Sequence, residues 1–487
     1  MRFGERLRQR REQRQLRDRL QLVADSDLFD PEWYLRTYPD VASSGLDPAF
    51  HYLVYGGKEG RHPGPRFDSK YYVQNNPGVD ESGLNPLVHY LLRGRAEGCR
   101  TMQVSAFSVS EAHPELAPLD VHLRAGGEPR VTVIVESTAP GYLLGGVMTS
   151  LLIGVLLAER LGARVRLVTR TEPPDLSRVP DVLLASEIGV APEIEAVHLS
   201  ARSPLASIDV TAADIFLTTS WWTTRAALGS VASRQVVYLV QEDERLFYPS
   251  GDASLRCEET LAEPGLTFAV NTELLFRHFA TGEPGNVARA GAWFEPAFPS
   301  ALYQPRTGSS GRRRFAFYAR PRNARNLYER GLEVIVDAIN RGVLAPDEWE
   351  FIFFGSPPDS VILPQGVHPT YSADLPLSAY AALLGTVDLG LALMASPHPS
   401  YPPLDMAASG GVAVTTRFGV KQQLSMYSDN ILVAGTGTKE LVGALGEGAR
   451  LAADHPLRTR QHADSKLARD WRASTAPLID WLSSRIS

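Results

Sequence analysis

Short apolar runs, each followed by a loop and a helix-forming stretch, occur in two series and constrain the fold of this chain most strongly. The first series begins with Val131-Thr-Val-Ile-Val135 and continues with a helical pattern over 147–161 and an apolar run at 164–168. The second series begins with Arg314-Phe-Ala-Phe-Tyr318. Fully apolar strands that alternate with helices are typical of parallel sheets covered on both faces. The pattern predicts an α/β protein with two doubly wound, Rossmann-like domains that face each other across a cleft.

Both series contain further elements of this kind. We expect strands of the first domain at 181–184, 215–218, 236–240 and 268–270, and of the second at 350–354, 388–394 and 411–415. Helices of the second domain are expected at 332–340, 377–384 and 404–409. The glycine loop at 141–146 follows the first strand but does not match G-x-G-x-x-G, so a dinucleotide site has little support.

Composition argues against several classes of protein. The chain has 487 residues, a net charge of −6 and only two cysteines, Cys99 and Cys257. This charge argues against nucleic-acid binding over the whole surface, and two cysteines provide neither a disulfide framework nor a cysteine-based metal site. No apolar run reaches the roughly 18 residues that span a bilayer. The arginine-rich start does not resemble a secretory signal. We therefore expect a cytoplasmic protein.

Residues 29–100 contain a duplication with a constant spacing of 38 residues. Phe29-Asp30-x-x-Trp33-Tyr34 recurs as Phe67-Asp68-x-x-Tyr71-Tyr72, and His51-Tyr52-Leu53 recurs as His89-Tyr90-Leu91. We predict two short helices in each unit, because Asp-Pro and Asn-Pro pairs are typical of an N-cap followed by the first helical residue. One unit cannot bury its aromatic side chains alone, so the units should stack together or onto a neighbour. The single histidine of each unit fits aromatic packing better than a metal site.

The first 24 residues carry eight arginines and three acids, a net charge of +5. Apolar residues fall loosely on one helical face of this segment, namely Phe3, Leu7, Leu16, Leu20 and Val23. The segment is either a solvated tail or a basic helix that contacts an anionic membrane surface or a protein. We divide the chain into this basic helix or tail (1–24), two helical repeats (25–104), a linker (105–128), a first Rossmann-like domain (129–307), a second (308–470) and a C-terminal helix (471–487).

The segment Ser396-Pro-His-Pro-Ser-Tyr-Pro-Pro-Leu-Asp405 follows the expected strand 388–394 and leads into the helix 404–409. A strand, a tight loop and a helix N-terminus form an arrangement that holds anions at the carboxyl end of a sheet. We expect free N–H groups at Ser400, Tyr401, Leu404 and Asp405, and expect the Asp405 carboxylate to suit a ribose hydroxyl. The alternative is an ordinary turn with a capping acid.

A basic segment, Arg320-Pro-Arg-Asn-Ala-Arg325-Asn326, follows the first strand of the second domain. Arginines at a strand end, opposite the proline-rich loop, would grip a diphosphate from two sides. The alternative is a solvated run of charge. Gly419 and Lys421, which follow the strand 411–415, are weaker candidates for the same site.

These segments together resemble the retaining GT-B glycosyltransferases of family 4, and most closely the rhamnosyltransferases that build bacterial surface polysaccharides. The motifs that carry the resemblance, over about residues 130–470, are Tyr318-Ala-Arg-Pro-x-x-x-Arg325-Asn326, the segment 396–405, Thr219-Ser-Trp-Trp-Thr223 and Val240-Gln-Glu-Asp-Glu244-x-x-Phe-Tyr-Pro249. The 38-residue units likewise resemble modules fused to such transferases. In that family two acids eight residues apart line the donor site. The second corresponds to Asp405, whereas the first falls on Pro397, with His398 as the nearest polar residue.

The resemblance implies transfer of L-rhamnose from dTDP-L-rhamnose onto a growing bacterial polysaccharide or glycan, with retention at the anomeric carbon. The second domain would bind the nucleotide-sugar donor, and the first domain a glycan or lipid-linked saccharide acceptor. It also implies no essential metal or cofactor, and a location in the cytoplasm or at the inner face of the cell membrane. The implied residues are Arg320, Arg325, Glu242 and Glu244 for catalysis, Asn326, Gly355, His398, Ser400, Tyr401, Leu404 and Asp405 for the donor, and Gly145, Gly146, Trp222 and Gln241 for the acceptor.

Two other functions fit the same residues. One is a hexosyltransferase that uses a UDP or GDP sugar. The other is an inactive glycan-binding or scaffolding protein, which the missing acid at Pro397 favours. The pair Arg320 and Arg325 opposes the second alternative, because buried arginines without an anion are costly. The sequence also leaves open whether Glu242, Asp243 or Glu244 orients the acceptor.

Overall fold

The computed structural model describes residues 2–102, 112–139, 145–189, 193–200, 206–305, 311–356 and 360–486, with the side chains of 2–9 and 80 left out. The chain forms two compact units, Met1–Ser108 and Val109–Ser487. The predicted glycine loop at 141–146, the linker 105–128 and the segment 308–313 lie partly outside the described residues. Every helix of the described part is too short or too polar to cross a membrane.

The first unit is helical, and its repeats contain more elements than the sequence suggested. Each repeat forms three short α-helices and a π-helical turn, in place of the two helices expected. A proline or glycine just after each cap starts several of these helices afresh, which breaks each repeat into short pieces. The elements are α1 (Arg2–Ala24), then α2 (Pro31–Thr37), α3 (Pro39–Ser44), α4 (Pro48–His51) and η1 (Tyr52–Gly56), then α5 (Ser69–Asn75), α6 (Gly78–Ser82), α7 (Pro86–His89) and η2 (Tyr90–Gly94).

The predicted caps form as expected. The side chains of Asp30, Asp47 and Asn85 each accept a hydrogen bond from a backbone N–H in the first turn of the following helix. These bonds satisfy N–H groups that have no partner within the helix.

A buried tyrosine–histidine pair lies at the centre of each repeat. Tyr34 Oη is 3.0 Å from His51 Nδ1, and Tyr72 Oη is 2.9 Å from His89 Nδ1. Both tyrosines are fully buried in a core that the two repeats share with the end of α1. The repeats therefore stack on each other, and their histidines take part in aromatic packing.

Among the described side chains of α1, those at its end are packed. Leu20, Leu22 and Val23 contact the core of the repeats, whereas the side chains from Arg10 to Asp18 are exposed. Leu16, one of the expected apolar positions, is 42% exposed.

The second unit contains two α/β domains. The elements of the first domain are η3 (Pro114–Leu116), β1 (Val121–Leu123), β2 (Arg130–Val135), α9 (Gly146–Leu161), β3 (Arg164–Thr169), α10 (Val179–Ala185), β4 (Ile194–His198), β5 (Ile208–Val210), β6 (Ile215–Thr218), α11 (Trp221–Leu228), η4 (Ser233–Gln235), β7 (Val236–Val240), η5 (Glu244–Phe247), α12 (Asp252–Ala262), β8 (Thr267–Asn271), α13 (Glu273–Thr281), α14 (Asn286–Arg289) and β9 (Gly291–Phe294). A seven-stranded parallel sheet runs in the order β4-β3-β2-β6-β7-β8-β9, and β1 pairs with β5 in a separate ribbon. This order places β2 and β6 at the centre, where the strand order reverses.

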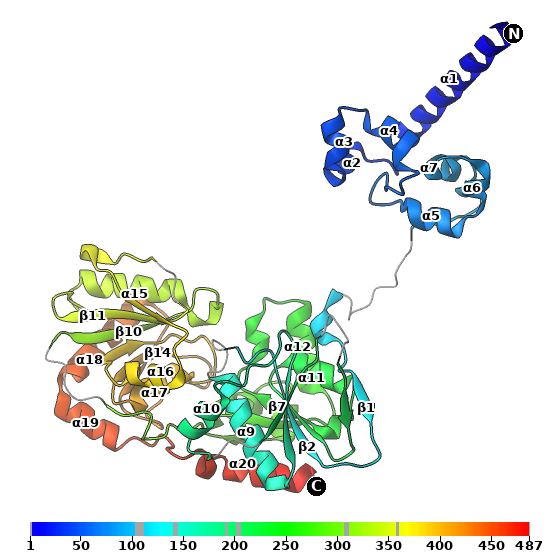
Figure 1. Ribbon diagram of the computed structural model, residues 1–487. Helices are drawn as coiled ribbons and strands as arrows, with labels where there is room; N and C mark the ends of the chain where they lie inside the picture. The colour runs from blue at the N-terminus through cyan, green and yellow to red at the C-terminus, as the bar shows by residue number, and fades with distance from the viewer. Residues whose placement is uncertain are drawn as a thin grey trace. The chain divides into compact units, whose positions relative to one another are not determined.

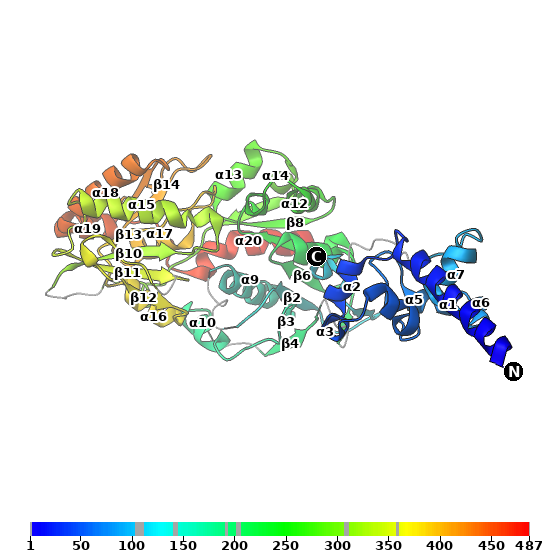
Figure 2. The ribbon, with the colours of Figure 1, turned by 90° about the horizontal axis from the view of Figure 1, so that it is seen from above.

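The elements of the second domain are β10 (Arg313–Ala319), η6 (Ala324–Asn326), α15 (Tyr328–Asn340), β11 (Trp349–Gly355), η7 (Pro364–Gly366), β12 (Thr370–Ala373), α16 (Leu377–Leu384), β13 (Leu389–Leu391), α17 (Tyr401–Ala408), β14 (Val412–Thr416), β15 (Ile431–Ala434), α18 (Thr438–Ala453), α19 (His455–Ala463) and α20 (Trp471–Ile486). Its six-stranded sheet is also parallel, in the order β12-β11-β10-β13-β14-β15. In the sheet cores, α15 and α18 cover one face, and α16 and α17 cover the other. Figure 2 shows α15 and α18 on one side of these strands and α16 on the opposite side.

The last helix returns to the first domain. α20 lies along α9 and contributes Trp471, Leu478 and Leu482 to the core of the first domain (Figure 1). Arg472 pairs with Glu159 at 2.6 Å, and Arg160 pairs with Asp480 at 2.9 Å. The two α/β domains are therefore joined by the chain at two places.

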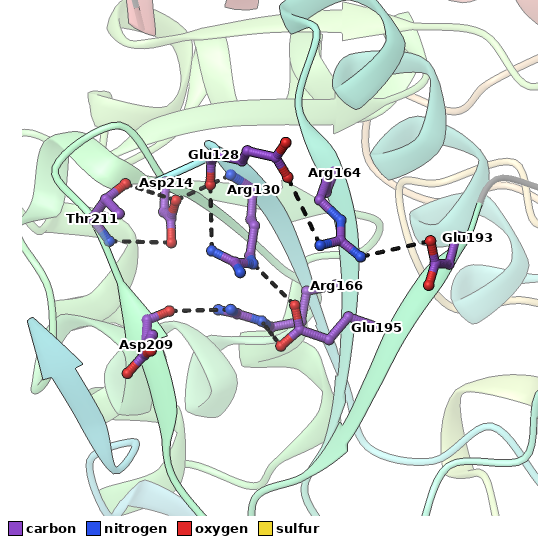
Figure 3. A network of polar contacts seen from close by, with 9 residues as sticks. All are labelled: Glu128, Arg130, Arg164, Arg166, Glu193, Glu195, Asp209, Thr211 and Asp214. Carbon is purple, nitrogen blue, oxygen red and sulfur yellow. Dashed lines mark hydrogen bonds and ion pairs between the residues drawn. The ribbon is translucent and has the colours of Figure 1, made fainter. Parts of the chain in front are cut away.

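A charged network lies at the edge of the first sheet where β2 and β3 begin (Figure 3). The Arg166 guanidinium on β3 is buried, and its Nε donates to Glu195 at 3.0 Å. Arg130 on β2 donates to the same carboxylate at 2.9 Å, so one acid on β4 bridges two cations. This edge is opposite to the one where ligands bind in parallel sheets.

One predicted strand is wrong. Residues 181–184 form the helix α10, in which Val182 and Leu183 are buried but Leu184 is 71% exposed. Pro180 favours a helix start, since its missing N–H needs no partner in the first turn. The edge strands β4, β9, β12 and β15 were missed, because their burial is partial and their apolar runs are short.

We expect Gly94→Ala to lower the free energy of unfolding of the first unit by about 1–3 kcal/mol, the usual cost of overpacking. A Cβ at position 94 would lie 2.1 Å from Tyr72 Oη, on a rigid ring buried in the core. Gly78→Ala is the matched control, because its Cβ would meet nothing closer than His89 Nε2 at 3.9 Å. Differential scanning calorimetry of both variants checks this prediction, and equal transition temperatures would contradict it.

Candidate functional site

A cavity of about 420 Å³ lies between the two α/β domains, at the carboxyl ends of strands from both sheets. Twelve of the fifteen predicted site residues line it. They are Arg320, Arg325, Glu242, Glu244, Gly355, His398, Ser400, Tyr401, Asp405, Gly145, Gly146 and Gln241.

The other three predicted residues lie outside the cavity. Asn326 is buried behind it and donates to the carbonyl of Leu393 at 3.3 Å. Leu404, a residue of α17, is fully buried among apolar side chains. Trp222 packs against the core of the first domain. The residues next to Asn326 and Leu404, Arg325 and Asp405, line the cavity, and all three of these predicted residues support the fold around it.

Two arginines reach the cavity from the end of β10. The Arg325 guanidinium carbon lies 3.8 Å from the centre of the Phe247 ring, and burial lowers the pKa of Arg325. Its Nε has no hydrogen-bond partner in the described structure although it is buried. Arg320 Nη1 is 3.4 Å from the Tyr318 hydroxyl. The two guanidinium groups therefore retain donors for an anion in the cavity.

Three consecutive acids after β7 have different environments. Asp243 points away from the cavity and pairs with Arg245 at 2.8 Å and with His278 at 2.9 Å. Burial opposes ionisation of Asp243, but hydrogen bonds from His278 and Arg245 outweigh it and lower its pKa to about 2. Asp243 is thus a structural ion pair, which leaves Glu242 and Glu244 as the acids that face a ligand.

The two remaining acids are deeply buried. Burial raises the pKa of Glu244 to about 7, although the Tyr238 hydroxyl and the Trp221 N–H donate to its carboxylate at 2.8 and 3.2 Å. Burial also raises the pKa of Glu242, and the charge of Arg325 and a hydrogen bond from the Ser396 hydroxyl partly offset this effect. The Glu244 carboxyl group is therefore suited to exchange protons near neutral pH.

The proline-rich loop is held by internal hydrogen bonds. The buried ammonium of Lys421 donates to the carbonyls of Met394 and His398, at 3.2 and 3.0 Å. Burial lowers the pKa of Lys421 to about 8, and the charge of Glu242 opposes this shift. Lys421 thus holds the loop from behind, since it does not line the cavity.

His398 replaces the absent acid in this loop. Its Nδ1 accepts a hydrogen bond from the Ser400 N–H at 3.0 Å, so the neutral ring carries its proton on Nε2. Burial, with the positive charges of Lys421 and Arg325, lowers the pKa of His398 to about 3. Nε2 is buried without a partner in the described structure. His398 therefore offers one neutral donor at the cavity.

The N-terminus of α17 offers fewer donors than expected. The helix begins at Tyr401, with Ser400 as its N-cap. The Ser400 N–H is already used by His398, and residues 402 and 403 are prolines. At least one of the four expected donors is therefore already bonded, so the arginines are the main anion-binding groups.

Asp405 is surrounded by tyrosines. The Tyr380 hydroxyl donates to its Oδ2 at 2.8 Å. Burial raises the pKa of Asp405 to about 7, and hydrogen bonds from Tyr380 and Tyr303 partly offset this effect. Because these hydroxyls occupy part of the carboxylate, Asp405 has limited capacity left for a ribose hydroxyl.

The side chain of Tyr401 crosses between the domains. Its hydroxyl lies 2.6 Å from Thr149 Oγ1 on α9 and accepts from Asn271 Nδ2 at 2.9 Å. The sequence suggested a contact to the nucleotide-sugar donor at Tyr401, but this hydroxyl links the first domain to the start of α17.

Sequence reasoning missed several residues that line the cavity. Most of them lie at or just after the carboxyl ends of strands of the second sheet, or in or just before α16, and the missed strand β12 explains two of them. They are Tyr318, Phe354, Ser356, Ser372, Asp374, Leu375, Tyr380 and, near the domain junction, Phe247 and Tyr303. The aromatic residues at the ends of β10 and β11 carried a signal, because apolar side chains at exposed strand ends suit a flat ligand. Among the described residues, no group of three or more His, Cys, Asp or Glu side chains is placed to hold a metal ion.

Comparison with known proteins agrees with this architecture. Residues 130–273 match the family WsaF, N-terminal domain, and residues 313–446 match WsaF, C-terminal domain. The structure of Anabaena HepE in complex with UDP is similar, with a TM-score of 0.51 and 15% identity, over 73% of this chain and 100% of that chain.

The chain carries both WsaF domains on a GT-B fold. This result confirms the predicted fold class. The O-antigen biosynthesis protein RfbC of Myxococcus xanthus is 30% identical over 303 residues, which are 60% of this chain and 22% of RfbC. The chain therefore spans about a fifth of the length of that relative.

We expect Glu244→Gln to stabilise the protein above about pH 7 and to leave its stability unchanged below about pH 4.5. With a pKa of about 7, folded Glu244 holds its proton more tightly than the unfolded chain does, so the free energy of unfolding falls as pH rises through this window. The amide cannot ionise and avoids that loss.

Urea unfolding of the variant and the wild type across this pH range measures the effect, with the exposed Glu258→Gln as the control. A difference that does not change with pH would show that Glu244 is ionised without cost.

Proposed function

We propose that this chain is a glycosyltransferase of bacterial polysaccharide biosynthesis that binds a nucleoside-diphosphate sugar on its second α/β domain. The main support for the proposal is that Arg320 and Arg325 both line the cavity. The buried Nε of Arg325 has no hydrogen-bond partner among the described residues. The similarity to RfbC supports the link to surface polysaccharide.

The arginines explain how the leaving group is stabilised. Breaking the anomeric C–O bond of a nucleotide sugar places negative charge on the departing diphosphate. Arg320 and Arg325 would meet that charge in a cavity that excludes most water, where electrostatic stabilisation is strong. Because two guanidinium groups provide this charge, the reaction needs no divalent metal.

The nucleoside would occupy the part of the cavity formed by the second domain. Tyr318 provides a flat aromatic surface there, while Ser372 and Asp374 provide hydrogen-bonding groups. Asp405 would accept a hydrogen bond from the ribose through the lone pairs of its carboxylate that Tyr380 and Tyr303 do not use.

The donor sugar would lie between His398 and the first domain. A hexose presents a 6-hydroxyl that L-rhamnose lacks, and the loop has Pro397 where related enzymes have an acid. A buried hydroxyl without a partner costs about 1–3 kcal/mol. This difference supports L-rhamnose as the donor sugar, and dTDP-L-rhamnose is the donor that we propose.

The acceptor would enter from the first domain. Gln241 Nε2 donates to the carbonyl of Gly146 at 3.0 Å, and its buried Oε1 has no partner among the described residues, so it can accept from a sugar hydroxyl. Glu242 and Glu244 would orient the attacking hydroxyl and take its proton. Attack from the face of the leaving group retains the anomeric configuration without an enzymic nucleophile. The basic helix α1 would hold the enzyme near an anionic membrane surface.

We expect Arg325→Ala to weaken binding of dTDP by about 1.5–3 kcal/mol, the range for a hydrogen bond to a charged group. Arg322→Ala is the matched control, because Arg322 lies in the same segment but is exposed and outside the cavity. Isothermal titration with dTDP, UDP and GDP gives the affinities. Equal affinity of both variants for dTDP would remove Arg325 from the site.

We expect transfer from dTDP-L-rhamnose to exceed transfer from UDP-glucose by about tenfold to a hundredfold, the equivalent of one unpartnered hydroxyl. The assay follows release of the nucleoside diphosphate in the presence of EDTA. Equal use of UDP-glucose, or strict dependence on Mn²⁺, would favour a hexosyltransferase. Tight donor binding without transfer to any acceptor would favour a glycan-binding protein.

A further inference from the structure

The two helical repeats differ at one groove, and the difference points to a second binding site. In the first repeat, Arg61 fills the groove. Its guanidinium pairs with Asp40 at 2.8 Å and Glu59 at 2.6 Å, and it lies 5.0 Å from the centre of the Tyr38 ring. The first repeat thus closes this groove with its own side chain.

The second repeat lacks this plug. Cys99 occupies the position of Arg61. The Arg61 N–H donates to the carbonyl of Gly56, and the Cys99 N–H donates to the carbonyl of Gly94, both at 2.8 Å. Asn76 replaces Tyr38, and Gly78 replaces Asp40. All three side chains that formed the plug are therefore smaller or lost, although Glu97 still corresponds to Glu59.

An open groove of about 550 Å³ results. It is lined by Asn75, Asn76, Pro77, Gly78, Glu81, Ser82, His89, Arg93 and Glu97. Within the described structure, Glu81, Arg93 and Glu97 form no ion pair, so their charges remain available to a ligand.

A buried histidine also faces this groove. His89 is 5% exposed, and its Nδ1 is bound to the Tyr72 hydroxyl, which leaves Nε2 as the ring atom that can meet a ligand. A Cβ on Gly78 would lie 3.9 Å from this Nε2, so the glycine keeps the approach open.

The polar groups of the groove define the chemistry of its ligand. The amide N–H groups of Asn75 and Asn76 already donate to backbone carbonyls, so their oxygens remain as acceptors beside the two carboxylates. Arg93 adds a strong donor. A cation would meet Arg93 and an anion would meet Glu81 and Glu97, whereas hydroxyl groups can donate and accept in turn.

We propose that the groove of the second repeat binds a neutral, polyhydroxylated ligand, a short stretch of glycan. This site lies wholly within the unit Met1–Ser108 and does not depend on the transfer reaction proposed for the cavity. The repeats then act as a glycan-binding module on the same chain.

The test uses the full chain and saturation-transfer difference NMR with the methyl glycosides of L-rhamnose, D-mannose, D-galactose and D-glucose. At least one glycoside should bind, and saturating dTDP should leave its signal unchanged. The double substitution Gly78→Asp and Cys99→Arg introduces the ion pair that fills the groove of the first repeat, and it should abolish the signal.

Two milder variants keep the test valid if the plugged variant fails to fold. Arg93→Ala and Glu97→Gln should each weaken binding about tenfold, the equivalent of one hydrogen bond to a charged group. Arg36→Ala, an exposed arginine of the first repeat, is the matched control. The proposal is overturned if no glycoside binds or if dTDP displaces the bound glycoside. It is also overturned if the Arg93 and Glu97 variants bind like the wild type.

Discussion

The buried polar contact between Glu242 and the second α/β domain is the interaction on which the cavity depends. This carboxyl group of the first domain accepts from the Ser396 hydroxyl and lies in the field of Arg325 and Lys421. Removing a carboxylate from water is costly unless cations and donors surround it. The two domains therefore meet where their charges compensate each other, and this meeting point is also the wall of the cavity.

The same low-dielectric environment explains the unusual acids of the site. Glu244 and Asp405 are each hydrogen-bonded, yet burial raises the pKa of both to about 7. Asp243, between Glu242 and Glu244 in sequence, has a pKa of about 2 because Arg245 and His278 neutralise it. Neighbours in sequence thus have opposite protonation behaviour, since each faces a different side of the loop after β7.

Much of the fold could be predicted from local patterns, and the errors have local causes. The buried central strands, such as β2 and β10, are mostly apolar and were predicted within one or two residues. Residues 181–184 carry an equally apolar pattern but form a helix, because a helix on the sheet surface also buries one side of such a segment. Leu404 and Asn326 belong to the correct motifs, yet their side chains point into the core.

By itself the sequence determined the two parallel sheets, the repeats and the position of the arginine segment, because hydrophobic periodicity and cap residues act over a few neighbours. Only the tertiary structure decided which polar groups share the cavity, that Asp243 pairs elsewhere, and that His398 accepts from the Ser400 N–H before α17. It also decided that Arg61 closes one repeat while Cys99 leaves the other open. These outcomes depend on contacts between distant residues, whose energies no local pattern contains.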